Sequence, residues 1–376
     1  MAARQPNHDC VIDGARRWTY AELQAQARSV AAGLWDLGIR PGDRVAILMG
    51  NRAEWLSSYF AILGLGAEAV ALNTWLTPSE QAYQLNHAEV TTLILADRFR
   101  GRDVLAELEE MRAIGLPALE RLIVLGDRVP DGATPFEDLA GEIDPGLWST
   151  AQADDVACIL YTSGSTARPK GVPLSHAGQL WVIETRLRLG QDLDRHRLLV
   201  AAPLYHMNGL AISTFALAAH ASEVLLTQFR ADDYIKAIEQ FGCSWLTSVP
   251  TMLALLAQET ARLEATDLSS VRIVAMGSAP VSDNLMATLQ ERFSGCAFVN
   301  GFGTTETGAI CFGAHPDDLP RPLVSLGHPI SGIDVRLVAD GENEPDEGVL
   351  HIRSPALMTG YHNLPEKTAE VMTDDG

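Results

Sequence analysis

The sequence predicts an α/β protein in which largely parallel β-sheets are covered by helices. The main observation is that segments with helical spacing of apolar residues alternate with short apolar runs along most of the chain. The length of 376 residues exceeds what a single core usually supports, so we expect at least two packed lobes. Apolar residues make up 47% of the chain, and no low-complexity tract interrupts it, as is typical of globular proteins.

The first half of the chain repeats a pattern of helix and strand. Apolar residues recur at helical spacing over residues 19–37, 54–65 and 79–86. Strand-like apolar runs lie between and after these helices, at residues 44–49, 69–72, 92–96, 122–125 and 156–161. This alternation is what indicates a sheet with mainly parallel strands.

The second half continues the alternation and then changes character. Strands are predicted at residues 198–201, 223–227, 245–249, 271–276 and 297–301, and helices at residues 231–240 and 250–259. Polar residues break the apolar stretch 210–226, which predicts a buried helix running into a strand and not a membrane span. Residues 335–338 and 348–353 predict an antiparallel hairpin. We therefore expect an α/β part over residues 1–326 and a small β-rich part over residues 327–376.

Charge and cysteine content narrow the range of partners and compartments. The 48 acidic residues outnumber the 28 basic ones, and the formal net charge of −20 disfavours binding to nucleic acid or anionic lipid. The five cysteines include no CxxC pair, which favours reduced thiols over a disulfide framework or a zinc site. The first residues, MAARQPNHDC, lack the features of a secretory signal, so a cytoplasmic location is predicted.

The most specific motif is YTSGSTARPKG at residues 161–171. Its small hydroxyl residues and glycine allow backbone N–H and side-chain O–H groups to converge on phosphate oxygens, while Lys170 adds a positive charge. The spacing differs from that of a Walker A loop, which excludes a P-loop NTPase. An ordinary polar loop between strand and helix is the alternative. The predicted phosphate-binding residues are Thr162, Ser163, Gly164, Ser165, Thr166 and Lys170.

Two later strand ends carry further candidate site residues. The segment GSAP, residues 277–280, consists of small residues that would let a flat ring approach the backbone. The segment NGFGTTE, residues 300–306, combines glycines with an aromatic ring, two threonines and a carboxylate. An ordinary tight turn is the alternative for the first segment. A helix N-terminus capped by Thr304 or Thr305 is the alternative for the second.

Two further segments each contain one feature that is typical of a binding site. The segment PLYHMNG, residues 203–209, contains the lone histidine His206, which is either structural or part of a site. The segment GLGAEA, residues 64–69, satisfies the dinucleotide pattern G-x-G-x-x-A. A helix-like stretch precedes that segment and a strand follows it, the reverse of the order in a Rossmann loop, so binding of NAD is excluded.

In their order along the chain, these motifs resemble those of the adenylate-forming superfamily of acyl-CoA synthetases, peptide-synthetase adenylation domains and luciferases. Segments WTYAEL at 18–23, GIRPGDRVAI at 38–47 and GHPISG at 327–332 extend the resemblance over nearly the whole chain. It implies a luciferase-like fold: two similar lobes of mixed, mostly parallel sheet in an αβαβα layering, with a small β appendage. The family continues into a small mobile domain with the adenylation lysine, so this chain is expected to adenylate slowly alone.

The resemblance also implies a role for each matching residue. Lys170 and the loop hydroxyls would hold the β- and γ-phosphates of ATP, and Glu306 would ligate Mg²⁺. Phe302 would stack on adenine, and Thr305 would contact the α-phosphate. His206 would line the acyl pocket, with the next helix forming a wall through Leu210, Ala211, Thr214 and Phe215. The expected nucleotide-binding residues are Gly277, Ser278, Ala279, Pro280, Asn300, Gly301, Phe302, Gly303, Thr304 and Thr305.

The implied reaction is attack of a substrate carboxylate on the α-phosphorus of ATP, with release of pyrophosphate, followed by transfer of the acyl group to coenzyme A. A fatty or other apolar acid is the leading substrate class. No charged residue stands out as a partner for a second carboxylate, which favours monocarboxylic acids. Loading of a carrier-protein thiol is one alternative. A catalytically silent relative is another, because Ala167 replaces the usual glycine and Phe302 the usual tyrosine. A homodimer is compatible with the sequence.

Overall fold

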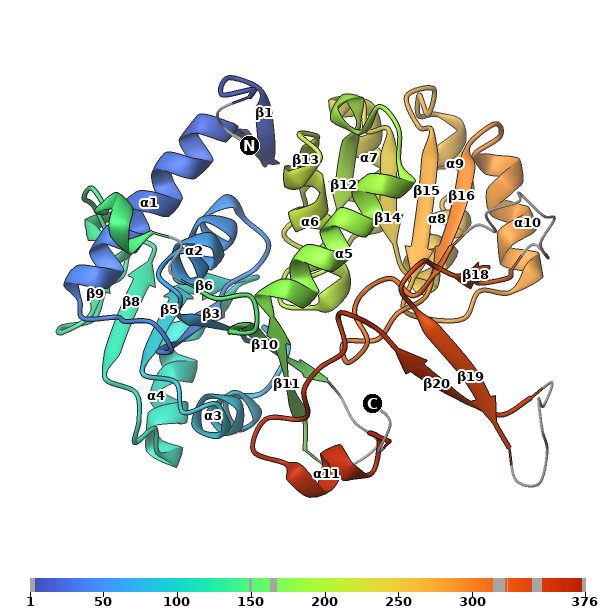
Figure 1. Cartoon of the computed structure of the whole chain (residues 1–376). Helices are drawn as coiled ribbons and strands as arrows, with labels where there is room; N and C mark the ends of the chain where they lie inside the picture. Colours follow the sequence, from blue (N-terminus) through green and yellow to red (C-terminus); the bar gives the residue numbers. More distant parts are fainter. Residues whose placement is uncertain are drawn as a thin grey trace.

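Two seven-stranded sheets form the body of the molecule, with the first on the left and the second on the right of Figure 1. The structure is a computed structural model that describes residues 4–148, 151–162, 168–313, 322, 324–339 and 347–373. In that part of the chain, no helix combines the length and the apolar character that a membrane span requires.

The first sheet has the strand order β11-β10-β4-β3-β5-β8-β9. Neighbouring strands pair in parallel, except β10 and β11, which pair antiparallel at one edge. Its strands are β3 (Arg44–Leu48), β4 (Glu68–Ala71), β5 (Thr92–Ala96), β8 (Arg121–Leu125), β9 (Thr134–Pro135), β10 (Val156–Thr162) and β11 (Lys170–Ser175). A short separate pair, β6 (Arg98–Phe99) and β7 (Arg102–Asp103), follows β5.

The second sheet has the strand order β16-β15-β14-β12-β13-β1-β2. It is parallel except for the antiparallel pair of β1 and β2, which come from the N-terminus and join the sheet where Val11 pairs with Glu223. Its strands are β1 (Asp9–Asp13), β2 (Arg16–Thr19), β12 (Arg197–Val200), β13 (Ser222–Leu225), β14 (Trp245–Ser248), β15 (Ile273–Gly277) and β16 (Ala297–Gly301).

Helices form three layers around the two sheets, which gives the order αβαβα. One core cluster joins both sheets through the helices between them, which are α1 (Tyr20–Asp36), α2 (Ala53–Gly64), α5 (His176–Leu189) and α6 (Met207–Ala218). A second cluster covers the outer face of the first sheet with α3 (Pro78–His87) and α4 (Val104–Ile114). A third covers the outer face of the second sheet with α7 (Ala231–Phe241), α8 (Pro250–Gln258), α9 (Thr260–Glu264) and α10 (Asp283–Arg292).

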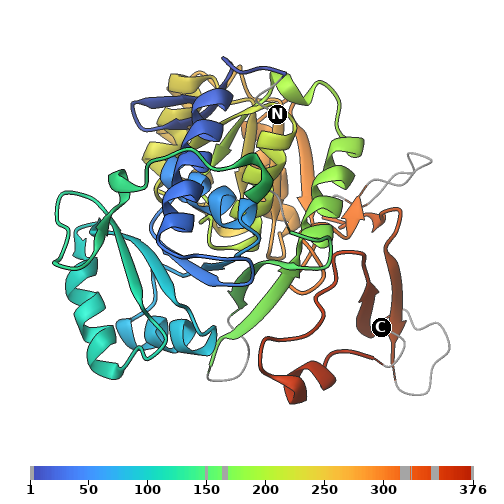
Figure 2. The ribbon, with the colours of Figure 1, turned by 60° about the vertical axis from the view of Figure 1, so that its left-hand side comes forward.

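The C-terminal part is small and stands beside the two sheets, as Figure 2 shows from a second direction. The hairpin of β19 (Asp334–Val338) and β20 (Val349–Arg353) has mostly exposed side chains. It follows the short pair of β17 (Phe312–Gly313) and β18 (His328–Pro329), and it precedes α11 (Pro365–Ala369).

Local sequence signals explain where several helices begin. At the start of α1, the Thr19 side chain accepts a hydrogen bond from the backbone of Glu22, whose carboxylate in turn accepts one from Thr19. The same capping box of Thr77 and Glu80 starts α3. Helix α2 ends at Gly64 and β4 begins at Glu68, so the order around GLGAEA is helix and then strand, as predicted.

The predicted fold class is confirmed, including the two mostly parallel sheets, the αβαβα layering and the hairpin. Strands β1, β2 and β11 and helix α5 were not among the predicted elements. Strand β1 is stabilised by pairing with β13, about 210 residues later in the chain, so no local pattern marks its place in the second sheet.

Candidate active site

Most of the predicted site residues lie around one cavity of about 430 Å³ between the two sheets. The cavity opens at the carboxyl ends of β15 and β16, which is where ligands bind in open α/β sheets. The predicted residues that line it are Thr162, Lys170, His206, Gly277, Ser278, Gly301, Gly303, Thr304, Thr305 and Glu306. Ala279, Pro280, Asn300 and Phe302 are predicted residues that do not line it.

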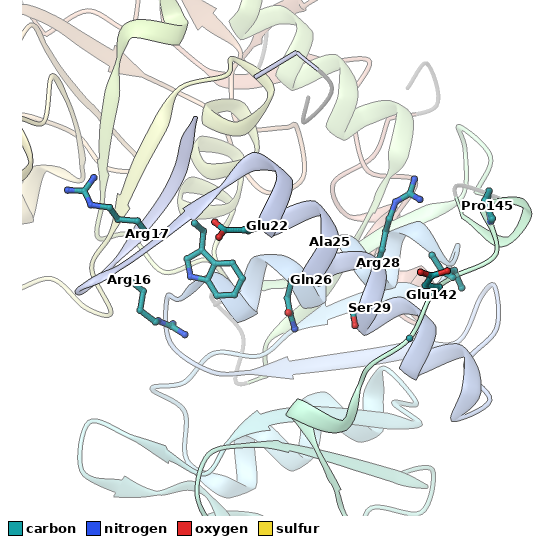
Figure 3. Close-up of a pocket in the computed structure, with 12 residues that line it drawn as sticks. Arg16, Arg17, Glu22, Ala25, Gln26, Arg28, Ser29, Glu142 and Pro145 are labelled. Atoms are coloured by element: carbon teal, nitrogen blue, oxygen red, sulfur yellow. The ribbon is translucent and has the colours of Figure 1, made fainter. Parts of the chain in front are cut away.

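A larger hollow than this cavity lies along α1, and Figure 3 shows the residues that line it. It has a volume of about 1050 Å³ and runs along α1 between Arg16 and Pro145. None of the predicted site residues lines it. The Arg16 guanidinium there is already neutralised by the carboxylates of Asp13 and Glu54. The site is therefore assigned by the chemistry of its lining and not by the size of the hollow.

Close backbone packing explains the glycines at the two strand ends. Gly277 and Gly301 end β15 and β16 and stand opposite each other. A Cβ atom at Gly277 would lie only 2.8 Å from the carbonyl oxygen of Gly301, so no larger residue fits there. The next residue, Ser278, has a left-handed backbone with φ of 67°, and its hydroxyl accepts a hydrogen bond from Asn208 at 3.2 Å. Helix α10 starts three residues after Pro280, with Ser282 as its cap.

The segment after Gly303 is a tight turn, and the alternative prediction of a capped helix is wrong. Thr304 and Thr307 exchange hydrogen bonds between backbone N–H and side-chain hydroxyl, both at 3.1 Å, and Thr304 forms a β-bridge with Gly308. A Cβ atom at Gly303 would lie 2.3 Å from the Gly308 carbonyl oxygen. Five residues in so small a loop leave no room for a helix, and the turn presents Glu306 to the cavity.

Three hydrogen-bonded side chains connect the end of the phosphate loop to the turn that follows Gly303. Lys170 Nζ donates to the Tyr361 hydroxyl at 2.8 Å, and that hydroxyl donates to Glu306 Oε1 at 2.9 Å. The ammonium also lies 4.0 Å from the centre of the Tyr361 ring. Burial, together with the neighbouring Glu306 carboxylate, raises the pKa of Tyr361, so its hydroxyl keeps its proton. Sequence reasoning gave no role to Tyr361.

The phosphate loop is described only at its two ends. Thr162 ends β10 and Lys170 begins β11, and the two residues pair across the hairpin. The Thr162 hydroxyl is buried, lines the cavity and has no hydrogen-bond partner among the described residues. The predicted residues Ser163, Gly164, Ser165 and Thr166, together with Ala167, lie outside the described residues.

Phe302 does not line the cavity, and its stacking on adenine stays a prediction. It lines a neighbouring hollow, and its ring packs edge-on against Phe312 with centroids 5.5 Å apart. Phe312 is the phenylalanine that lines the cavity. Asn300 is buried on β16 and donates to the Val324 carbonyl oxygen at 3.2 Å, so its amide holds a neighbouring segment.

His206 lines the cavity just before α6, and burial lowers the pKa of its imidazole, which favours the neutral form. The predicted face of α6 is wrong. Met207, Asn208 and Ile212 line the cavity from this helix. Leu210, Ala211, Thr214 and Phe215 are instead buried away from it. Because α6 is apolar on nearly all sides, its sequence spacing could not show which face meets the cavity.

Two further cavity residues were missed by sequence reasoning. Arg186 on α5 and Trp245 at the start of β14 both line the cavity, at its inner end. Neither belongs to a motif, and both are brought to the cavity by the packing of α5 and β14 around Phe215. No group of three or more His, Cys, Asp or Glu side chains suited to a metal occurs in the part of the chain that the structure describes.

Comparison with known proteins agrees with this fold. The chain belongs to the family of AMP-binding enzymes, whose profile matches residues 1–362. A feruloyl-CoA synthase from Amycolatopsis sp is 35% identical, over 99% of this chain and 72% of that protein. The fold superposes on the anthranilate CoA ligase AuaEII in complex with anthranoyl-AMP, with a TM-score of 0.87, 26% identity and coverage of 98% and 70%. The N-terminal domain of FACL13 from Mycobacterium tuberculosis gives a TM-score of 0.86 at 25% identity, with coverage of 99% and 92%.

Proposed function

We propose that this protein activates a carboxylic acid as an acyl-adenylate, with release of pyrophosphate, and passes the acyl group to coenzyme A. The observation that carries the proposal is the gathering of Lys170, Thr305, Glu306 and His206 around one cavity. These residues come from three separate segments of the chain, because Thr305 and Glu306 are neighbours. They supply a cation, a hydroxyl, a carboxylate and a neutral imidazole, the groups that adenylation needs near a phosphate and a carboxylate.

The polar side of the cavity would bind the phosphates. Lys170 supplies positive charge at the end of the phosphate loop, and Tyr361 holds its ammonium toward the cavity by the 2.8 Å hydrogen bond. The unpartnered hydroxyl of Thr162 is a donor that a phosphate oxygen would satisfy. Thr305 lines the same wall. Positioning of ATP and the acid by these groups would supply most of the rate enhancement, because adenylation requires little covalent chemistry from the protein.

The site also fits a single Mg²⁺. The Glu306 carboxylate lines the cavity, and the Tyr361 hydroxyl occupies only its Oε1 atom. One carboxylate suffices, because Mg²⁺ commonly takes its other ligands from substrate phosphates and water. When bound, the ion would supply positive charge next to the leaving pyrophosphate.

The acid would enter the apolar part of the cavity, beside His206. Met207, Ile212, Trp245 and Ile310 give this part an apolar and partly aromatic lining. The names of two related proteins, a feruloyl-CoA synthase and an anthranilate CoA ligase, both refer to aromatic acids. The substrate class is therefore an acid with an apolar or aromatic body, which includes the fatty acids first considered.

The test combines binding and product formation. Thermal unfolding of the 376-residue chain should shift upward with ATP and Mg²⁺ together, since a ligand that binds only the folded state stabilises it. Formation of AMP and acyl-CoA is then measured with a panel of fatty and aromatic acids. Because the chain covers 72% of the Amycolatopsis relative, the assay also uses the chain joined to the C-terminal region of that protein, called the extended enzyme below.

Nucleotide-dependent stabilisation with acyl-CoA formation from at least one acid supports the proposal. Nucleotide binding without any acyl-adenylate in the extended enzyme would contradict it, and would instead indicate the catalytically silent relative. Formation of acyl-adenylate that is transferred to a carrier-protein thiol but not to coenzyme A would favour the carrier-loading alternative.

A further inference from the structure

The inner end of the cavity contains a cation for which the proposed reaction has no use. Arg186 lines the cavity, and its guanidinium carbon lies 6.0 Å from the centre of the Phe215 ring. Its Nη2 donates to the Ala309 carbonyl oxygen at 3.2 Å. Its Nε is buried without a hydrogen-bond partner, and no carboxylate among the described residues forms an ion pair with it. Most of the five N–H donors of this guanidinium are therefore unused.

A second unused donor packs against the same aromatic ring. Trp245 lines the cavity and packs edge-on against Phe215, with ring centroids 5.7 Å apart. Its Nε1 is also buried without a partner in the described part of the chain. Donors of α5 and β14 thus flank the same aromatic ring. Buried donors without acceptors cost free energy, and a ligand oxygen placed among them would remove that cost.

The depth of these donors indicates which part of the substrate they would meet. The nucleotide side of the cavity lies at the carboxyl ends of the second sheet, where Ser248 ends β14. Trp245 begins the same strand, three residues and about 10 Å away. Phe215 is nine residues, or about 14 Å, along α6 from His206. Trp245 and the Phe215 ring, against which the Arg186 guanidinium packs, are therefore displaced from the strand ends and from His206, toward the part of the cavity that the body of the acid would occupy.

The charge of Arg186 selects among the oxygen groups that could bind there. Burial is the cause that lowers the pKa of its guanidinium to about 10, so the group is still cationic at neutral pH. An anion offsets a buried cation better than a neutral group does. A carboxylate also matches the planar fork of a guanidinium through two parallel hydrogen bonds. A hydroxyl would satisfy one donor but would leave the charge without compensation.

We propose that Arg186 is a specificity-determining residue that binds a second carboxylate at the remote end of the substrate acid. This inference rests on the proposed adenylation at the other end of the same acid. It differs from the sequence-based expectation of a monocarboxylic substrate, which followed from the lack of a recognisable cationic partner. Arg186 escaped recognition because it reaches the cavity through helix packing and lies outside every motif.

The experiment compares acids that differ only at the remote end. Linear acids of about eight to twelve carbons match the estimated depth, each as the diacid, the ω-hydroxy acid and the ω-methyl monocarboxylic acid. Calorimetry gives the dissociation constant of each acid for the 376-residue chain saturated with AMP. The diacid should bind roughly 10- to 100-fold more tightly than its ω-methyl counterpart, as expected for hydrogen bonds to a charged group. The ω-hydroxy acid should lie between them.

Substitutions on α5 identify the residue responsible. Arg186→Met should remove the preference for the diacid and leave binding of the ω-methyl acid unchanged or tighter. Arg186→Lys should keep part of the preference, because the charge remains but the fork is lost. Arg188→Met is the matched control, since Arg188 is exposed on the same helix and pairs with Glu184 at 3.0 Å. This control should bind all three acids like the unaltered protein.

Each outcome decides a specific claim. If the unaltered protein binds AMP and monocarboxylic acids without preferring the diacid, the inference about Arg186 is wrong and the proposed function stands. Equal weakening of all acids by Arg186→Met would show a structural role through Ala309 and would also reject it. Failure of the unaltered protein to bind AMP contradicts the proposed function, and with it this inference. The acid series on the unaltered protein remains decisive even if Arg186→Met does not fold.

Discussion

The charged side chains at the two ends of the cavity differ in how they are paired. At the outer end, Lys170 and Glu306 are joined through the Tyr361 hydroxyl by hydrogen bonds of 2.8 and 2.9 Å. At the inner end, Arg186 has one hydrogen bond to a backbone carbonyl and no carboxylate partner in the described ranges. The outer end can therefore keep its geometry with no ligand present, and the inner end is completed by a ligand.

The difference indicates which properties each end controls. Groups that hold each other in place are suited to a step common to all substrates, because their positions do not depend on the acid that is bound. A cation with unused donors is suited to selecting among acids, because its interaction differs from one acid to the next. Variants at the outer end should thus change the rate for every acid, and variants at the inner end should change the ranking of acids.

The largest effect is expected from Lys170→Ala. Removing the ammonium takes away charge stabilisation at the phosphates, and the adenylation rate of the extended enzyme should fall by well over 10-fold for every acid. Pyrophosphate exchange measures this rate. Lys236→Ala is the control, because Lys236 is an exposed lysine on α7 that pairs with Asp232. An unchanged rate in Lys170→Ala would remove this residue from the phosphate site.

Glu306→Gln should also lower the adenylation rate by more than about 10-fold, again for every acid. The amide oxygen can still accept the hydrogen bond from Tyr361, so the geometry is retained while the negative charge is lost. The concentration of Mg²⁺ needed for half-maximal rate should rise, which titration of the metal measures. Glu264→Gln, on the exposed side of α9, serves as the control. A normal rate with a normal Mg²⁺ requirement would contradict the metal role.

Tyr361→Phe should have a smaller effect, roughly a 10-fold loss of rate, because it removes one hydroxyl that bonds to two charged groups. Tyr361 acts here as a positioning residue, so the Mg²⁺ requirement should also rise, through release of Glu306. Tyr20→Phe is the matched control: its buried hydroxyl donates to the Ala221 carbonyl oxygen at 2.7 Å and lies outside the cavity. That control should lower the unfolding temperature and leave the rate unchanged. If both variants behave alike, Tyr361 has only a structural role.

The smallest expected effect on the adenylation rate concerns Glu223, a buried carboxyl that lies outside the cavity. Neither of its oxygens has a hydrogen-bond partner among the described residues, and burial raises its pKa to about 8. Between pH 4.5 and 8 the folded state therefore binds more protons than the unfolded state. The contribution of the protonated Glu223 carboxyl to the stability of the folded state is fully present below pH 4.5. This contribution is lost as pH rises through 8.

Glu223→Gln removes this titration. The variant should gain stability over the unaltered protein by at most about 1.4 kcal/mol per pH unit between pH 4.5 and 8, with a constant difference above. Denaturant unfolding at several pH values measures the difference, with the exposed Glu239→Gln as control. A difference that does not change with pH would show that Glu223 is ionised in the folded state. Adenylation rates should not change, because this carboxyl is sealed in the core of the second sheet.

Sequence reasoning predicted strands correctly where the local pattern of residues is enough to decide the structure. The predicted strands 92–96 and 297–301 match β5 and β16 residue for residue. Strand β5 is buried along its whole length, so its sequence is a continuous apolar run. Sequence reasoning failed where a partner far along the chain decides the structure. Strands β1 and β2 join the second sheet only through β13. The capped-helix alternative at Thr304 failed for a local reason, because a threonine hydroxyl that caps a helix and one that closes a turn give the same sequence pattern.

The sequence by itself determined the fold class and most of the outer wall of the cavity. Its motifs stand at strand ends, and parallel strands bring those ends to one edge of a sheet. Only the tertiary structure decided that Tyr361 bridges Lys170 and Glu306, and that Arg186 enters the cavity. The physical reason is distance along the chain: Tyr361 is 191 residues from Lys170, and the position of Arg186 follows from how α5 packs on α6. No local spacing encodes either contact.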